Sequence, residues 1–280
     1  MLRIGRISYA NCTPIFHELQ KLIAGEDYRF VGGVPSRLNA LLAAGEIDVC
    51  PSSSIEYALH PENYLILPDL SISSIGAVGS VLLFSRVPIN ELDGQSILLS
   101  SESATSVNLL RILMKKRFAC SCSFAVSVQS LESALQEASA MLLIGDSALR
   151  ATLLETDLFV YDLGELWHDW TGLPFVFALW FCGCQVARDR YAEVARLASY
   201  LIASKERACA DLESIAHESA EVQWMGSARL VAYWRDNISY DLDKRHLDGL
   251  TLFYRYCTDL GLLPVEPTLR FLERTASQDI

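Results

Sequence analysis

Two stretches rich in serine and threonine stand where apolar, helix-like periodicity begins, at residues 51–57 and 101–106. One hydroxyl of each stretch can cap the helix start. Further hydroxyls and backbone N–H groups then remain at the positive end of a helix dipole, where anions bind. A single such start is common, whereas a pair of them fits a ligand with two negative groups. The hydroxyl residues that we expect to bind this ligand are Ser53, Ser54, Ser103, Thr105 and Ser106.

Asn11 and Ser80 are two further polar residues with the chemistry of a binding site. Asn11 lies in the loop 8–14, and its amide can donate to or accept from a bound hydroxyl or carboxylate. A helix cap or an Asx turn is the alternative role for Asn11. Ser80 is a lone hydroxyl in the apolar run 77–85. A buried hydroxyl needs a hydrogen-bond partner, and a ligand is one candidate.

A fourth polar element combines residues 144–146 with residues 167–175. We expect Asp146 and Thr171, one from each segment, to contact the ligand, with an N-cap as the alternative role for Asp146. Ligands of open α/β sheets bind where the strands end, so these loops are expected to meet at one site.

Motifs for several other chemistries are missing from the sequence. It contains no G-x-G-x-x-G, no G-x-x-x-x-G-K-[ST] and no G-x-S-x-G. The eight cysteines include Cys120/Cys122 and Cys182/Cys184, pairs that lack the two-residue gap of zinc sites and have no nearby histidine. We therefore expect no metal, no nucleotide cofactor and no serine-hydrolase chemistry.

The composition bounds the class of protein and its partners. The 280 residues are 51% hydrophobic and 20% charged, which excludes disordered and low-complexity classes. The net charge of −11 and the lack of a basic footprint predict no nucleic-acid partner. No apolar run approaches the roughly 18 residues of a membrane span, and no secretory signal is visible, so we expect a cytoplasmic protein without a membrane partner.

Strand-like and helix-like segments alternate through the first two thirds of the chain, and the remainder is helical. Predicted strands are 2–8, 28–34, 47–50, 77–85, 97–100, 123–126, 141–144, 158–161 and 175–182. Predicted helices are 14–24, 35–45, 52–59, 103–116, 130–138, 146–154, 188–206, 208–219, 224–236, 244–260 and 268–276. The alternation predicts parallel sheets with helices on both faces.

This order of segments predicts an α/β fold of two lobes with a helical C-terminal tail, as in type-2 periplasmic-binding-protein folds. Residues 1–86 and 182–280 are expected to form lobe 1, and residues 87–181 an inserted lobe 2. The ligand is expected in the cleft between the lobes. Hinge segments near 85–87 and 177–181, where the chain would cross between the lobes, are predicted to absorb the rotation if the cleft closes.

Six collinear segments in the first 185 residues each carry a weak motif. They are R-I-S-Y-A-N-C-T-P-I (6–15), G-E-I-D-V-C-P-S-S-S-I-E-Y (45–57), L-P-D-L-S-I-S-S-I-G-A-V-G-S-V-L-L-F-S (67–85), S-A-T-S-V-N-L-L (103–110), L-L-I-G-D-S-A-L (142–149) and D-W-T-G-L-P-F-V-F-A-L-W (169–180). As a set, they resemble the chorismate dehydratase family of the futalosine route to menaquinone. The tail resembles that family only in general character.

The resemblance implies a cofactor-free lyase that converts chorismate to 3-[(1-carboxyvinyl)oxy]benzoate and water. The functional Asn and Ser of the family fall on Asn11 and Ser80 here. Ala10 and Thr13 stand where the family usually has apolar residues such as Leu, which puts the shape of the pocket wall in doubt but leaves Asn11 in place.

Two other functions stay open at this point. One is the sister enzyme of the same route, 1,4-dihydroxy-6-naphthoate synthase, although the segments 103–107 and 171–180 fit the dehydratase better. The other is a non-catalytic small-anion binding protein, which would need an export signal that Met1–Ser8 does not show. The oligomeric state is not predicted.

Overall fold

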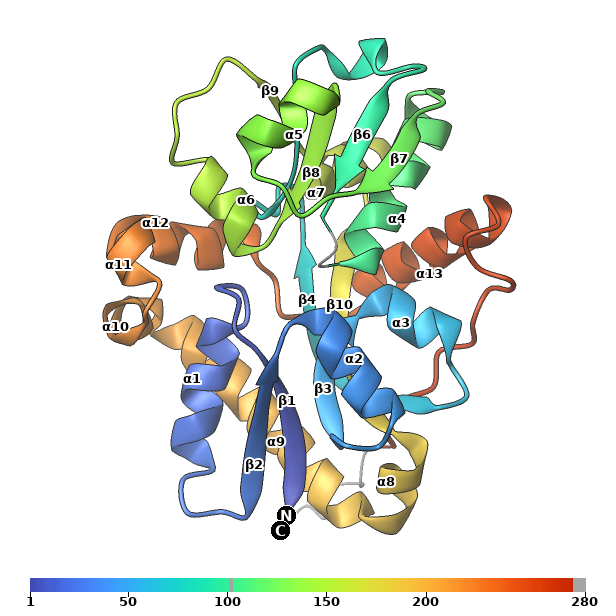
Figure 1. The fold of residues 1–280 in the computed structure, drawn as a ribbon. Coiled ribbons are helices and arrows are strands. Elements are labelled where there is room, and N and C mark those ends of the chain that lie inside the picture. The colour runs from blue at the N-terminus through green and yellow to red at the C-terminus, as the bar shows by residue number, and fades with distance from the viewer. Residues whose placement is uncertain (101–102, 274–280) are drawn as a thin grey trace.

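The computed structural model describes residues 1–100 and 103–273. Its first half is built on a five-stranded sheet of order β2-β1-β3-β10-β4 (Figure 1). The strands are β1 (Leu2–Ile7), β2 (Tyr28–Gly33), β3 (Val49–Ser53), β4 (Tyr64–Ser74) and β10 (Phe175–Gly183). The connecting helices are α1 (Thr13–Leu22), α2 (Pro35–Ala43) and α3 (Ser54–Leu59).

The second half is built on a five-stranded sheet of order β7-β6-β8-β5-β9. The strands are β5 (Val81–Ser85), β6 (Ser96–Leu99), β7 (Ser123–Val126), β8 (Ala140–Ile144) and β9 (Phe159–Asp162). The helical segments of this half are η1 (Ile89–Glu91), α4 (Ala104–Ile112), η2 (Leu113–Arg117), α5 (Leu131–Glu137), α6 (Asp146–Ala151) and α7 (Leu163–Thr171).

Both sheets are mixed, which corrects the expectation of parallel sheets. In the first sheet, β1 is parallel to β2 and β3, but β10 is antiparallel to β3 and β4. In the second sheet, β6 is parallel to β7 and β8, but β5 is antiparallel to β8 and β9. β5 and β10 are the strands by which the chain enters each sheet from the other half, and this return reverses their direction.

The chain crosses between the halves at other places than those predicted. It leaves β4 of the first sheet, passes through residues 75–80 and enters β5 of the second sheet. It returns through α7 into β10. Residues 85–87 and 177–181 thus lie at the end of β5 and inside β10, where ladder hydrogen bonds hold most of these residues in a sheet. The division into lobes at 86/87 and 181/182 stays a prediction.

No strand was predicted over residues 64–74, where the structure has β4, and the sequence of this strand explains why. Pro68 and Asp69 interrupt the alternation of apolar and polar side chains, and Asp69 has a positive φ of 62°. The register between β4 and β10 shifts beside this point. A bulge of this kind breaks the period of two on which strand prediction rests.

The helical tail after β10 consists of α8 (Cys184–Asp189), α9 (Tyr191–Ala210), α10 (Leu212–Glu218), α11 (Val222–Met225), α12 (Ser227–Ala232), η3 (Tyr233–Asn237) and α13 (Lys244–Asp259). The helix predicted over 268–276 is wrong for residues 268–273, which have no helical structure, and residues 274–276 lie outside the described residues. Figure 1 shows α10–α12 on one side of the junction between the halves and α13 on the other. The tail therefore reaches both halves.

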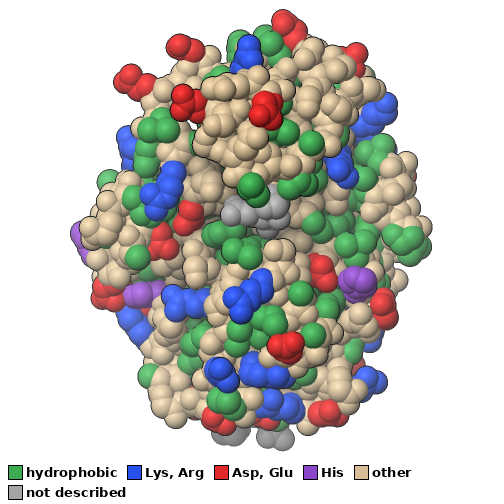
Figure 2. Space-filling model, viewed as in Figure 1, with side chains coloured by type: hydrophobic (Ala, Val, Ile, Leu, Met, Phe, Trp, Pro, Cys, Tyr) green, Lys and Arg blue, Asp and Glu red, His purple; other side chains and the backbone are tan. Residues whose placement is uncertain are grey.

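Figure 2 shows hydrophobic side chains reaching the surface around the middle of one face, between the two halves. Acidic and basic side chains are interspersed over the same face. Among residues 1–100 and 103–273, no helix combines the length and the apolar character that a membrane span requires.

Candidate functional site

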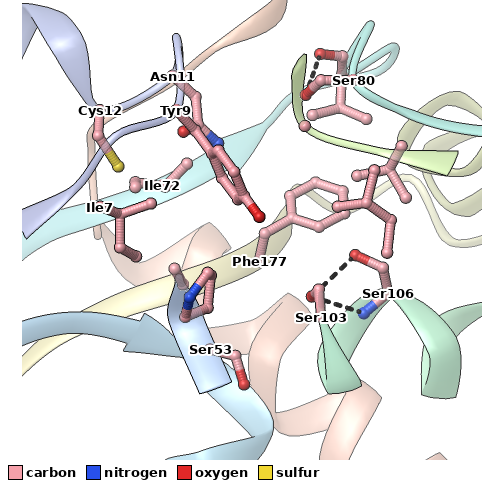
Figure 3. Close-up of a pocket in the computed structure, with 16 residues that line it drawn as sticks. Ile7, Tyr9, Asn11, Cys12, Ser53, Ile72, Ser80, Ser103, Ser106 and Phe177 are labelled. Carbon is pink, nitrogen blue, oxygen red and sulfur yellow. Dashed lines mark hydrogen bonds between the residues drawn. The ribbon is translucent and has the colours of Figure 1, made fainter. Parts of the chain in front are cut away.

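A cavity lies between the two sheets, at the ends of β1, β3 and β8 (Figure 3). The same edge receives the crossing segment 75–80 and the start of α4. Its lining is mostly apolar, with a few polar side chains from both halves. The lining residues are Ile7, Tyr9, Asn11, Cys12, Pro35, Ser53, Ile72, Val78, Ser80, Val81, Ser103, Ser106, Ile144, Gly145, Phe177 and Ala178. This is the composition of a small-molecule site, in which a few polar groups fix the ligand's orientation.

Asn11 lies in the turn between β1 and α1 and lines the cavity. Its backbone oxygen accepts a hydrogen bond from the Tyr240 hydroxyl at 2.8 Å, which holds the turn in place. Its side-chain oxygen Oδ1 is buried and has no hydrogen-bond partner among the described residues. A buried amide oxygen without a partner is costly to the fold, so this atom points to a ligand.

Ser80 also lines the cavity, 1% exposed, in the turn that precedes β5 rather than inside a strand as predicted. Its Oγ accepts a hydrogen bond from the Tyr233 hydroxyl at 2.9 Å. The Val78 carbonyl oxygen lies 3.5 Å from Oγ, at the limit of hydrogen-bond distance. The Ser80 hydroxyl proton is thus available to a molecule in the cavity.

The two serine-rich helix starts face each other across the cavity, as Figure 3 shows. Ser53 ends β3, and its Oγ is buried without a partner in the described part of the chain. Ser103 caps α4 by accepting the Ser106 N–H at 3.4 Å, and the two hydroxyls are 3.2 Å apart. Ser101 and Glu102, from the same predicted stretch, lie outside the described residues. The structure thus brings Ser53, Ser103 and Ser106 to the cavity.

Ser54 and Thr105 do not line this cavity, although both were predicted to bind the ligand. Their side chains contact each other, with Ser54 Oγ 3.3 Å from Thr105 Oγ1. Ser54 Oγ donates to the Val176 carbonyl at 2.9 Å, and Thr105 Oγ1 accepts the Ile55 N–H at 3.1 Å. These hydroxyls join the start of α3 to the start of α4 across the two halves.

Asp146 and Thr171 lie outside the lining of the cavity as well. Asp146 accepts the Ala10 N–H at 3.0 Å and so holds the turn next to Asn11, while Gly145 is the N-cap residue of α6. Thr171 donates to the Trp167 carbonyl at 2.9 Å and accepts the Leu173 N–H at 3.2 Å at the end of α7. Asp146 therefore links the start of α6 to the turn that carries Asn11, and Thr171 serves the local structure at the end of α7.

The cavity has little charge of its own. No carboxylate, histidine, lysine or arginine of the residues that the structure describes lines it. Burial raises the pKa of the Cys12 thiol, with a smaller contribution from the Asp146 charge, so the thiol stays neutral. Within the described ranges, no group of three His, Cys, Asp or Glu side chains could hold a metal ion.

Several residues at this site have no signal in the sequence. Tyr9 and Phe177 line the cavity from the first turn and from β10. Their aromatic character is ordinary for a core, so nothing local marks them. Tyr233 and Tyr240 contact Ser80 and Asn11 from more than 150 positions away in the chain. Only the fold brings them together.

Solved structures of low sequence identity share this architecture. A protein of Archaeoglobus fulgidus superposes with a TM-score of 0.73 at 17% identity, over 94% of this chain and 98% of that one. The alkanesulfonate-binding protein of Xanthomonas axonopodis pv. citri, bound to MOPS, gives 0.69 at 15% identity, over 95% of each chain. A Candida albicans protein described as having the generic periplasmic binding protein fold gives 0.63 at 11% identity, over 100% and 99%. The predicted fold class is confirmed.

Sequence comparison identifies relatives that are more similar. A chorismate dehydratase of Thermus thermophilus is 37% identical over an alignment of 195 residues, and the alignment covers 63% of this chain and 68% of that protein. A chorismate dehydratase of Campylobacter jejuni is 31% identical over an alignment of 182 residues, and the alignment covers 64% of this chain and 66% of that protein. Residues 2–259 match the family described as menaquinone biosynthesis. With the match covering nearly the whole chain, this protein belongs to the menaquinone biosynthesis family.

Proposed function

We propose that this protein is a chorismate dehydratase, a carbon–oxygen lyase that converts chorismate to 3-[(1-carboxyvinyl)oxy]benzoate and water. The reaction would serve the futalosine route to menaquinone in the cytoplasm. The observation that carries the proposal is the pair Asn11 and Ser80, which face one cavity with an unpartnered amide oxygen and an available hydroxyl proton. The names of the two relatives support the same reaction.

The reaction removes the proton from ring carbon 3 of chorismate and the hydroxyl group from carbon 4. The electron pair of the C3–H bond first spreads to the ring carboxylate, through the double bond between them. It then forms the C3–C4 double bond while the C4–O bond breaks, and the ring becomes aromatic. Hydrogen-bond donors aimed at the ring carboxylate lower the barrier because they stabilise the charge that develops there.

Chorismate is a dicarboxylate, and the cavity offers donors from both halves. Ser103 and Ser106 lie at the start of the nine-residue helix α4, where hydroxyls and N–H groups suit a carboxylate. Ser53 and Ser80 present hydroxyls from the other walls. A ligand held on both sides is oriented for reaction, and such positioning contributes about 7–11 kcal/mol in well-oriented model reactions.

We infer that the enolpyruvyl carboxylate of chorismate itself takes the proton from carbon 3. It can pass this proton to the leaving hydroxyl, so that water departs and the charges balance. The inference is supported by the lack of a carboxylate or histidine among the described lining residues. Asn11 and Ser80 would then orient the substrate rather than abstract the proton.

The experiment incubates the purified protein with chorismate and follows substrate and product by mass and by ultraviolet absorbance. Formation of 3-[(1-carboxyvinyl)oxy]benzoate, above a control without protein, is the expected result. Calorimetric binding of chorismate without turnover would instead support a non-catalytic binding protein. If the protein neither binds nor converts chorismate, the proposal is contradicted. The activity of 1,4-dihydroxy-6-naphthoate synthase is then the one to assay.

The location of the base is tested with carboxylate variants. Glu56 accepts hydrogen bonds from Asn39 and Tyr64, away from the cavity, and Asp146 holds the Ala10 N–H. We expect Glu56→Gln, Asp146→Asn and Glu102→Gln to keep kcat within a few-fold. A variant that binds chorismate normally but no longer turns it over would place the base on the protein.

A further inference from the structure

The tail segment 233–240 contacts the turn that carries Asn11. The indole Nε1 of Trp234 donates to the Ala10 carbonyl at 2.7 Å, and the Tyr240 hydroxyl donates to the Asn11 carbonyl at 2.8 Å. Trp234 and Tyr240 are buried, 2% and 4% exposed. These bonds fix the backbone of the turn from behind and leave the Asn11 side chain toward the cavity.

The same tail segment contacts the turn that carries Ser80. The amide Nδ2 of Asn237 donates to the Ala77 carbonyl at 3.0 Å, and the Tyr233 hydroxyl donates to Ser80 Oγ at 2.9 Å. Gly79 has a φ of +71°, and a Cβ there would lie 3.3 Å from the Asn237 side chain. The Tyr233 bond differs from the others because its acceptor is the side-chain oxygen of a residue that lines the cavity.

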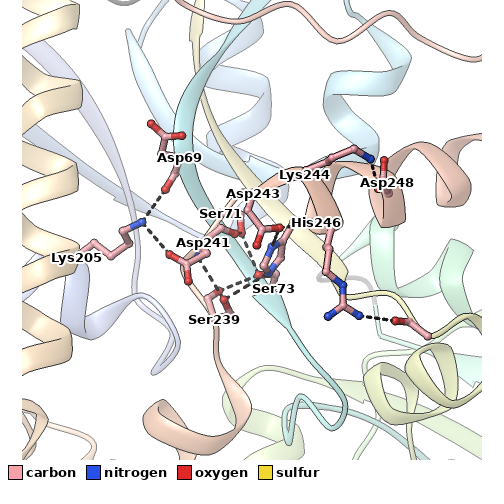
Figure 4. A network of polar contacts seen from close by, with 12 residues as sticks. Asp69, Ser71, Ser73, Lys205, Ser239, Asp241, Asp243, Lys244, His246 and Asp248 are labelled. Atoms are coloured by element: carbon pink, nitrogen blue, oxygen red, sulfur yellow. Dashed lines mark hydrogen bonds and ion pairs between the residues drawn. The ribbon is translucent and has the colours of Figure 1, made fainter. Parts of the chain in front are cut away.

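The segment is itself anchored to β4 by the polar network of Figure 4. The Ser73 N–H and the Ser239 N–H each donate to the other residue's carbonyl at 2.8 Å, and the Ser71 N–H donates to the Tyr240 carbonyl at 3.0 Å. Lys205 donates to the Asp69 carbonyl and to the Asp241 carboxylate. The network gives Tyr233 and Tyr240 a fixed frame on the strand that leads into the Ser80 turn.

The hydrogen bonds around Ser80 determine what its hydroxyl can do. A serine hydroxyl has one proton and two lone pairs, and Tyr233 occupies one lone pair. Burial raises the pKa of the Tyr233 phenol, so it remains a donor at any working pH. With that donor in place, the Ser80 proton is directed away from Tyr233, and the Val78 carbonyl at 3.5 Å competes for it only weakly.

We propose that Tyr233 is a positioning residue: by donating to Ser80 Oγ, it orients the Ser80 hydroxyl as a hydrogen-bond donor to the substrate's developing charge. Donation from Tyr233 also polarises the Ser80 O–H bond, because linked hydrogen bonds strengthen one another in a buried site. This inference rests on the proposed dehydration of chorismate. It assigns a role in the site to the tail, which none of the polar loops predicted from the sequence includes.

The test measures kcat and KM for chorismate in the parent protein of residues 1–280, Tyr233→Phe, Ser80→Ala and the double variant. Tyr233→Phe removes one oxygen, and we expect kcat to fall about 10-fold with KM changed less than about 3-fold, since one donor to a reacting group is weakened. In the Ser80→Ala background, the same change is expected to alter kcat less than about 2-fold, because Tyr233 acts through Ser80.

Tyr57→Phe is the matched control, because Tyr57 is 0% exposed and its hydroxyl bonds the backbone of Thr268 and Arg270, away from the cavity. We expect it to lower the unfolding temperature without lowering kcat. If Tyr233→Phe is too unstable to assay, the double variant is compared with Ser80→Ala, because the double variant removes both hydroxyls of the pair and leaves neither without its partner. A double variant much slower than Ser80→Ala would then overturn the positioning role.

The outcomes separate this inference from the proposed function. If the parent protein forms no product from chorismate, the proposed function and this inference are overturned together. An active parent with an equally active Tyr233→Phe, or a double variant much slower than Ser80→Ala, would overturn the positioning role alone. The expected result is a loss in the single variant that disappears in the double one.

Discussion

Ser80 and Ser54 are both buried serines beside a strand end, and each lies next to a buried tyrosine of the tail. Tyr254 donates to the Ser54 backbone oxygen at 2.6 Å, while the Ser54 hydroxyl donates to the Val176 carbonyl at 2.9 Å. Tyr233 donates instead to the Ser80 hydroxyl oxygen. The Ser54 hydroxyl donates its proton to an acceptor within the fold, whereas the Ser80 hydroxyl proton is available to a molecule in the cavity.

Burial and residue type therefore do not distinguish a structural serine from a functional one. Both side chains are at most 1% exposed. What separates them is the distance from the hydroxyl oxygen to its carbonyl acceptor, which is 2.9 Å for Ser54 and 3.5 Å for Ser80. Substitutions that remove each polar group should therefore act on different quantities, stability in one region and turnover in the other.

The largest effect is expected from Asn11→Ala. This change removes the side-chain amide of a residue that lines the cavity, as Ser80 does. Loss of one hydrogen bond made in the transition state should lower kcat by about 10²–10³-fold. The free energy of unfolding should stay level or rise, because Asn11 Oδ1 has no partner among the described residues. Chorismate kinetics and urea unfolding measure the two quantities.

Asn39→Ala is the matched control for that amide. The Asn39 side chain accepts from Ser52 Oγ and donates to Glu56 at 3.3 Å, so its polar atoms serve the fold. It should lose stability and keep kcat within a few-fold. Equal losses of kcat in Asn11→Ala and Asn39→Ala would end the distinction between the two regions.

A smaller effect is expected from Ser54→Ala, on the structural side of the comparison. Removing this hydroxyl leaves the Val176 carbonyl without its donor inside the protein. We expect the free energy of unfolding to fall by about 1–3 kcal/mol, with kcat within a few-fold of the parent. A stable variant with severely reduced turnover would mean that Ser54 binds the substrate, as predicted from the sequence.

The smallest effect concerns Asp146, which joins the two halves at the Ala10 N–H. Burial raises the pKa of its carboxyl group, and the Glu221 charge adds to this. A raised folded pKa gives stability that is full below the ordinary pKa of aspartate and is lost as pH rises through the folded pKa. Asp146→Asn keeps an acceptor oxygen for Ala10 but does not titrate.

The stability of the parent relative to Asp146→Asn should therefore decrease as pH rises. Urea unfolding of both proteins at steps between about pH 4 and 7 measures the difference. If the stability of the parent relative to Asp146→Asn instead increases as pH rises, the hydrogen bond from Ala10 outweighs burial and lowers the pKa of Asp146.

Much of this fold follows from local sequence pattern. Pro14 and Pro35 stand in the first turns of α1 and α2, and Gly45, with a φ of +69°, follows the end of α2. Such signals fix the elements within a few residues. The direction of each strand could not be predicted from local pattern, because it depends on β5 and β10 entering their sheets from the opposite half.

The candidate site was predictable in its loops but not in its side chains. Successive residues at a helix start point in different directions, so Ser53 faces the cavity while Ser54 faces Thr105. Sequence periodicity cannot choose between such neighbours when both are serines. Nor can it foresee Tyr233, whose contact with Ser80 depends on the path of the tail.

The most direct test of the account is the turnover of chorismate by the parent and by folded Ser80→Ala, measured side by side. The substitution removes one oxygen, so a purely structural serine would give a nearly normal enzyme. We predict that the parent forms 3-[(1-carboxyvinyl)oxy]benzoate and that Ser80→Ala loses about 10²–10³-fold in kcat. Because the buried Tyr233 hydroxyl loses its acceptor, Ser80→Ala should also lose about 1–3 kcal/mol of unfolding free energy, as Ser54→Ala does, and the loss of kcat is what separates the two variants. A folded Ser80→Ala protein that turns over chorismate within a few-fold of the parent would contradict the account.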